Sequence, residues 1–79
     1  MDIQPGIYRH FKGNRYDVIG VANHSETVEP MVVYRALYGT KETWVRPYAM
    51  FMEEVDRVKY PQVRQTYRFE KFEGDVPQA

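Results

Sequence analysis

The chain has 79 residues, enough for one domain, and 15% of them are aromatic, so a small core can bury enough apolar surface without a cross-link. Eleven basic residues balance eleven acidic ones, so no net charge draws the chain to nucleic acid or to an anionic membrane. The lack of cysteine excludes a disulfide framework, a thiolate nucleophile and a cysteine-based zinc site.

The chain also lacks the sequence features of secretion and of membrane insertion. Its first ten residues contain no basic region followed by an apolar run, as a signal peptide would. No apolar stretch approaches the ~20 residues that span a bilayer. We therefore expect a single cytoplasmic domain without a membrane anchor. Its core is expected over residues 6–72, followed by a flexible tail over residues 73–79.

The first half of the chain predicts three strands joined by turns. Residues 7–11 follow a Pro-Gly turn signal, and the Lys-Gly-Asn run after them is typical of a hairpin turn. Residues 16–24 are rich in β-branched side chains, and Gly20 among them indicates a bulge or a sharp bend. A polar loop, residues 23–30, leads to a third strand over residues 31–38. This strand is apolar on both faces and is therefore expected in the centre of the sheet.

The second half predicts a fourth strand followed by a tight turn. The strand covers residues 43–46 and carries Trp44, which we expect to be buried in the core. Pro47 is expected to end the strand, because proline has no N–H to donate to a neighbouring strand. Residues 48–50 are expected to form a tight turn of 3₁₀ type.

The secondary structure of the segment between the tight turn and the last strand is ambiguous. Residues 51–58 fit a short helix at their apolar positions and also fit a strand, and a run of this length does not decide between them. A final strand over residues 66–72 is expected to place Tyr67 and Phe69 on the core face. Five to six short strands, with one short helix or 3₁₀ turn, predict a mainly β fold of the small, bent, SH3-like barrel type. An OB-type barrel ranks second.

Several short motifs carry a family resemblance. They are Tyr8-Arg9-His10-Phe11-Lys12-Gly13, His24-Ser25-Glu26-Thr27 with Glu29, Tyr34, and Trp44-Val45-Arg46-Pro47 with Met50-Phe51 and Glu53. In combination they resemble a family of small bacterial proteins known as the domain of unknown function family 1653. The likeness runs from about Gly6 to Val55, although Asn23 stands where it leads us to expect a basic residue. It implies a bacterial single-domain protein and no particular activity.

The histidines and acidic residues suggest two kinds of chemistry, and neither is well supported. Chain geometry opposes a catalytic triad of consecutive His24, Ser25 and Glu26, because side chains along an extended chain alternate in direction instead of converging. Together with Glu29 and His10, His24 and Glu26 would supply ligands of the types that zinc accepts, but the spacing matches no established zinc motif. We assign no catalytic residue, metal or cofactor. A small metal-binding protein or enzyme that uses these residues stays an alternative.

Aromatic, histidine and arginine side chains predict a ligand-binding surface, since arginine and aromatic residues are enriched where partners bind. The candidate residues are Tyr8, Arg9, His10, His24, Ser25, Glu26, Tyr34 and Arg46. The first hypothesis is a non-catalytic binding module for a peptide, a protein or a small ligand. Single-stranded nucleic acid is a further alternative, which the balanced charge disfavours. We also expect Arg46 to pair with Glu26 or Glu29 and so to pin the polar loop near His10.

Overall fold

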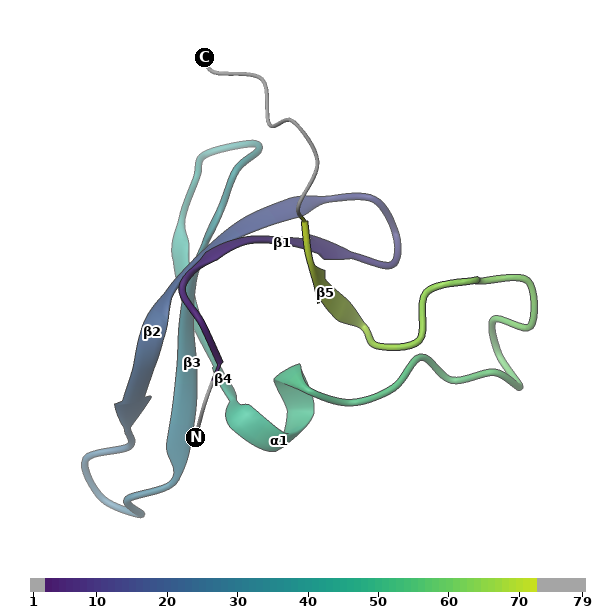
Figure 1. The fold of residues 1–79 in the computed structure, drawn as a ribbon. Coiled ribbons are helices and arrows are strands. Elements are labelled where there is room, and N and C mark those ends of the chain that lie inside the picture. Colours follow the sequence, from purple (N-terminus) through teal and green to yellow (C-terminus); the bar gives the residue numbers. More distant parts are fainter. Residues whose placement is uncertain (1–2, 73–79) are drawn as a thin grey trace.

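The computed structural model describes residues 3–72. Within this range the chain forms one antiparallel sheet of five strands in the spatial order β4-β3-β2-β1-β5 (Figure 1). The strands are β1 (Gly6–His10), β2 (Arg15–Asn23), β3 (Pro30–Ala36), β4 (Thr43–Pro47) and β5 (Phe69–Lys71), and the short helix α1 (Tyr48–Phe51) follows β4. The predicted mainly β fold is confirmed, and this strand order is consistent with an SH3-like barrel. The predicted tail, residues 73–79, lies outside the described residues.

The strand β2 carries the bend that Gly20 predicted. Its pairing with β3 changes register between Val18 and Gly20. An extra residue at such a bulge increases the local twist of the sheet. The sheet curls at this point, so β1 and β5 arch over the side on which α1 lies (Figure 1).

The core fills the concave side of this curled sheet. Six buried side chains form it: Tyr8, Val18, Val32, Tyr34, Phe51 and Phe69. The rings of Phe51 and Phe69 stack in parallel, with their centroids 4.2 Å apart. The helix α1 packs against β3 and β4, and its last residue, Phe51, is fully buried. One turn of helix therefore serves to insert this ring between the two ends of the sheet.

The segment after α1 is neither the helix nor the strand that its pattern allowed. Within the described range it has one isolated bridge, between Glu54 and Tyr67, and its apolar Val55 is buried. The last strand is shorter than predicted, because regular pairing with β1 is confined to β5. Phe69 lies in the core as expected, whereas Tyr67 is largely exposed, so that part of the prediction is wrong. Tyr67 precedes the regular strand, and 43% of its surface is exposed.

The expected burial of Trp44 is also wrong, because its side chain is 51% exposed. Trp44 pairs with Tyr34 and so shares its face of the sheet. However, β4 is an edge strand, and the concave side beneath it is already occupied by Phe51. The central position predicted for β3 is confirmed, with β2 and β4 on its two sides. None of the helical residues in the described range forms a segment long and apolar enough to cross a membrane.

Candidate functional site

The residues predicted to form one ligand surface lie in separate parts of the fold. Tyr8 and Tyr34 are buried in the core, where their rings contact Phe51. The loop with His24, Ser25 and Glu26 joins β2 to β3, at the opposite end of the molecule from the turn between β1 and β2 (Figure 1). The predicted surface therefore does not exist as a single patch.

The polar loop between β2 and β3 uses its side chains for its own backbone. The ring nitrogen Nδ1 of His24 accepts hydrogen bonds from the backbone N–H groups of Glu26 and Thr27, at 3.2 and 3.3 Å. The Thr27 hydroxyl accepts one from the N–H of Glu29, at 3.2 Å. Such bonds are the ordinary role of short polar side chains in turns. The richness of this loop in polar residues is thus explained by its own folding.

The predicted metal ligands are not gathered either. His10 ends β1, whereas His24 and the carboxylates of Glu26 and Glu29 belong to the distant loop. Within residues 3–72, no three His, Cys, Asp or Glu side chains are close enough together to hold a metal ion. The structure gives no support to the metal-site alternative.

Arg46 makes different contacts from those predicted. Its Nε donates to the Tyr34 hydroxyl at 3.4 Å, and its guanidinium lies 5.5 Å from the centre of the Phe69 ring. Arg46 pairs with Val32 across β3 and β4, so its side chain shares the concave face with that core residue. It therefore turns toward the core and not toward Glu26 or Glu29, and the proposed pairing is wrong.

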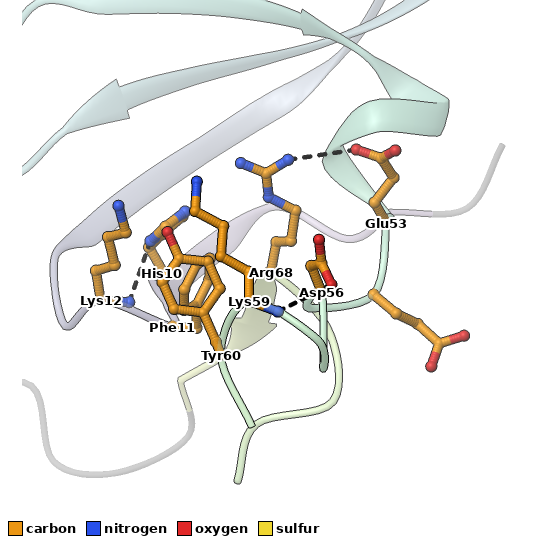
Figure 2. Close-up of a pocket in the computed structure, with 9 residues that line it drawn as sticks. His10, Phe11, Lys12, Glu53, Asp56, Lys59, Tyr60 and Arg68 are labelled. Atoms are coloured by element: carbon orange, nitrogen blue, oxygen red, sulfur yellow. Dashed lines mark hydrogen bonds and ion pairs between the residues drawn. The ribbon is translucent and has the colours of Figure 1, made fainter. Parts of the chain in front are cut away.

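A different group of residues lines an open cleft of about 500 Å³ beside the turn between β1 and β2. One wall comes from the end of β1 and this turn, and the other comes from the segment after α1 (Figure 2). The lining residues are His10, Phe11, Lys12, Glu53, Glu54, Asp56, Lys59, Tyr60 and Arg68. Of the residues predicted from the sequence, this cleft contains only His10. We call it the basic-aromatic cleft.

Three aromatic rings, those of His10, Phe11 and Tyr60, line the basic-aromatic cleft. The His10 ring lies 4.4 Å from Phe11 and 4.8 Å from Phe69, centroid to centroid. Phe11 in turn meets Tyr60 edge to face at 4.9 Å. Edge-to-face rings attract one another beyond the area that they bury. These contacts fix the β1–β2 turn against the segment after α1.

His10 is held in its neutral form. Its Nδ1 accepts the backbone N–H of Lys12 at 3.1 Å, which leaves Nε2 as the ring nitrogen that carries hydrogen. Burial lowers the pKa of His10 to about 4, and the nearby charges of Arg68, Arg46 and Lys12 add to this effect. A neutral imidazole at physiological pH acts here as a hydrogen-bonding group and adds no charge.

Two of the three carboxylates of the cleft have partners. Glu53 Oε1 forms an ion pair with Arg68 at 3.3 Å (Figure 2). Asp56 Oδ1 accepts the backbone N–H groups of Val58 and Lys59, at 3.0 and 3.2 Å. This arrangement is an Asx-type turn, in which the carboxylate organises the chain that follows it. Two of the three acidic side chains thus serve to shape the wall.

Two lysines and one tyrosine lie at the side of the cleft away from Glu53 (Figure 2). The Nζ atoms of Lys12 and Lys59 lie 5.6 and 5.5 Å from the centre of the Tyr60 ring. The ammonium group of Lys12, with that of Lys59 beside it, lowers the pKa of Tyr60. Within residues 3–72, neither lysine forms an ion pair. Figure 2 shows both ammonium groups near the Tyr60 hydroxyl, on the side of the cleft away from Glu53.

Lys12, Lys59 and Tyr60 were absent from the sequence-based candidates. No motif links them, because Lys12 follows β1 and the other two lie in the segment after α1, near the opposite end of the chain. The pairing of β5 with β1 and the bond from Phe11 N–H to the Arg68 carbonyl help to bring these regions together. The local spacing of residues in the sequence therefore does not predict this site.

Comparison with known proteins agrees with the resemblance seen in the sequence. Residues 6–71 match the model of a family described as a protein of unknown function (DUF1653). The crystal structure of a DUF1653 protein from Bordetella bronchiseptica is similar to this chain, with a TM-score of 0.77 and 32% identity, over 98% of this chain and 96% of that chain. No curated protein matches the chain. The chain therefore belongs to the DUF1653 family.

Proposed function

We propose that this domain is a non-catalytic binding module that holds an anionic group of its ligand, a phosphate or a carboxylate, between Lys12 and Lys59 in the basic-aromatic cleft. The observation that carries the proposal is the placement of two ammonium groups around one tyrosine ring at an open cleft. Two cations brought close together repel one another, and a bound anion relieves that repulsion. The Tyr60 hydroxyl lies beside them as an additional hydrogen-bond donor.

The arrangement of the carboxylates supports an anionic ligand. Glu53 is paired with Arg68, and Asp56 is bonded to the backbone of its own turn, so neither competes directly for Lys12 or Lys59. Glu53 and Asp56 belong to the same segment as Lys59, where they would repel an anion that enters in the wrong orientation. Such repulsion gives a site selectivity for how its ligand is placed.

The state of His10 supports binding and not catalysis. A general base works best when its pKa lies near the operating pH. The pKa of His10 is lowered to about 4 by burial and by neighbouring cations, so its imidazole is a weak base at neutral pH. Its Nε2–H group instead suits a ligand oxygen as a hydrogen-bond donor.

Titration of isotope-labelled protein with sodium phosphate, followed by NMR, tests the proposal. We expect shifts concentrated at Lys12, Lys59 and Tyr60, with a millimolar affinity, about 4 kcal/mol, typical of a small ion. Acetate should shift the same residues, because both ions carry the required charge. Lys59→Gln should weaken phosphate binding several-fold.

Lys41→Gln is the matched control for this titration. Lys41 is an exposed lysine between β3 and β4, so its substitution removes the same charge without touching the cleft. Phosphate binding by Lys41→Gln should equal that of the unmodified chain. An equal loss in both variants, or phosphate shifts that avoid Lys59 and Tyr60, would refute the proposed site.

A further inference from the structure

A second hollow lies on the other side of Lys12. Its volume is about 350 Å³, and it is lined by Arg9, Phe11, Lys12, Gly13, Val63, Arg64 and Gln65. Three of these side chains are cationic, and the lining contains no carboxylate. Since Phe11 and Lys12 also line the basic-aromatic cleft, the two depressions adjoin at these residues. We infer that they form one track for single-stranded nucleic acid, with successive phosphates on the two sides of Lys12 and bases against Phe11 and Tyr60.

This inference rests on the proposed function, because it extends the same anion site into a longer one. The second hollow is built by hydrogen bonds that join its walls. The Gln65 amide nitrogen donates to the backbone carbonyl of Arg9 at 3.0 Å, and Arg57 donates to the carbonyls of Val63 and Gln65. The chain that carries Arg64 is thereby attached to β1, which carries Arg9. The two guanidinium groups therefore face a hollow of defined shape.

The turn between β1 and β2 leaves room for a nucleic acid backbone. Gly13 has a φ of 106°, a conformation that favours glycine, and no atom lies within 4 Å of where its Cβ would stand. A turn without a side chain at this point keeps the path between the two depressions open. Lys12 stands at the middle of this path, where it can reach an anion on either side.

Aromatic rings between the cations favour nucleic acid over an acidic peptide. Phe11 and Tyr60 meet edge to face at 4.9 Å, and both are only partly buried. Bases stack on such rings without regard to their sequence, and cations along the track bind the phosphates. An acidic peptide offers charge but few flat rings. The balanced net charge disfavours nucleic acid for the chain as a whole, but the charged side chains that line the second hollow are all cationic.

The test is the fluorescence anisotropy of a short labelled oligothymidylate, measured between about 50 and 200 mM salt. With three to four phosphate contacts, the logarithm of affinity should fall with the logarithm of salt concentration with a slope of roughly −2 to −3. Arg64→Gln should reduce the size of that slope by about 0.7, the contribution of one phosphate contact on a single strand. The same substitution should weaken binding by roughly two- to fivefold, as expected for one exposed ion pair.

Two further variants separate charge from stacking. Tyr60→Leu should weaken binding and leave the salt slope unchanged, because it removes a ring and no cation. Lys41→Gln removes a lysine away from the track and should change neither quantity. A track that depends only on overall charge would instead respond equally to Lys41→Gln and to Arg64→Gln, which would overturn the inference.

Other outcomes distinguish this inference from the proposed function. If polyglutamate of similar length binds as tightly as the oligonucleotide, the track accepts acidic polymers and the assignment to nucleic acid is wrong. If phosphate shifts Lys59 and Tyr60 but the oligonucleotide does not bind, the second hollow plays no part and the proposed function stands. If neither phosphate nor oligonucleotide binds, both proposals fail.

Discussion

The loop between β2 and β3 differs from the long segment between α1 and β5 in how it is attached to the fold. Both connecting regions are polar. Most of residues 24–29 are exposed, and their hydrogen bonds stay within the loop. The long segment places Phe51 and Val55 in the core and bonds to β1 through Gln65 and through the Arg68 carbonyl. Only the second region can position side chains relative to the sheet.

This difference shows why a cluster of polar residues in the sequence was a poor guide to the site. Polar side chains that are neighbours in the sequence can reach the backbone N–H groups of their own loop. The side chains of His24 and Thr27 accept hydrogen bonds from such groups. A cleft needs two walls, and walls come from distant parts of the chain. Lys12 and Tyr60 meet because separate elements carry them.

The largest expected effect comes from removing the buried anchor of the long segment. Phe51 is fully buried and contacts the rings of Tyr8, Tyr34 and Phe69. Phe51→Ala should lower the free energy of unfolding by about 3–5 kcal/mol, as for other large aromatic truncations in cores. For a domain of this size such a loss approaches the total stability. Urea unfolding followed by circular dichroism measures it.

Trp44→Ala is the matching control for that measurement. The Trp44 side chain is 51% exposed on the edge strand β4, so its removal should cost less than about 1 kcal/mol. A loss below about 1 kcal/mol for Phe51→Ala would mean that Phe51 does not anchor the segment. A loss of about 3–5 kcal/mol for Trp44→Ala would mean that Trp44 is buried, as the sequence predicted.

The sequence was sufficient to predict most of the sheet and insufficient to predict the site. Alternating apolar residues and turn signals predicted the five strands within a few residues, and Gly20 predicted the bulge, because these features depend on local geometry. The burial of Trp44 and of Tyr67 was misjudged, since burial depends on which edge of a sheet stays uncovered. Periodicity cannot reveal that edge. The structure places two tyrosines of the expected ligand surface, Tyr8 and Tyr34, in the core, which the sequence pattern did not reveal.

Breaking the link between the long segment and β1 should have an intermediate effect. The Gln65 side-chain amide donates to the backbone carbonyls of Arg9, Tyr67 and Arg68 at 2.9–3.3 Å. Gln65→Ala leaves these carbonyls without that donor and should cost about 2 kcal/mol. Hydrogen exchange at the Phe11 amide, which bonds to the Arg68 carbonyl, should accelerate, and phosphate binding should weaken.

Thr27→Ala provides the comparison from the other region. It removes one local bond, from the Glu29 N–H to the Thr27 hydroxyl, and should cost about 0.5–1 kcal/mol. Phosphate binding should not change, because the loop lies at the other end of the sheet (Figure 1). If Thr27→Ala weakened phosphate binding as much as Gln65→Ala did, the two regions would be coupled and the contrast between them would be wrong.

The smallest expected effect separates the two histidines by pH. The pKa of His10 is about 4 in the folded chain, because of burial and nearby cations, against roughly 6.5 when unfolded. Between these values the unfolded chain binds a proton that the folded chain does not, so His10 lowers stability as pH falls from about 6.5 to 4 and has no such effect above that range. After allowance for solvent screening of the partly exposed ring, the loss is about 1 kcal/mol.

Urea unfolding at several pH values should show this loss in the unmodified chain and in His24→Gln, whereas His10→Gln should lack it. A loss that persists in His10→Gln would show that other groups cause it and that His10 is not held neutral in the cleft.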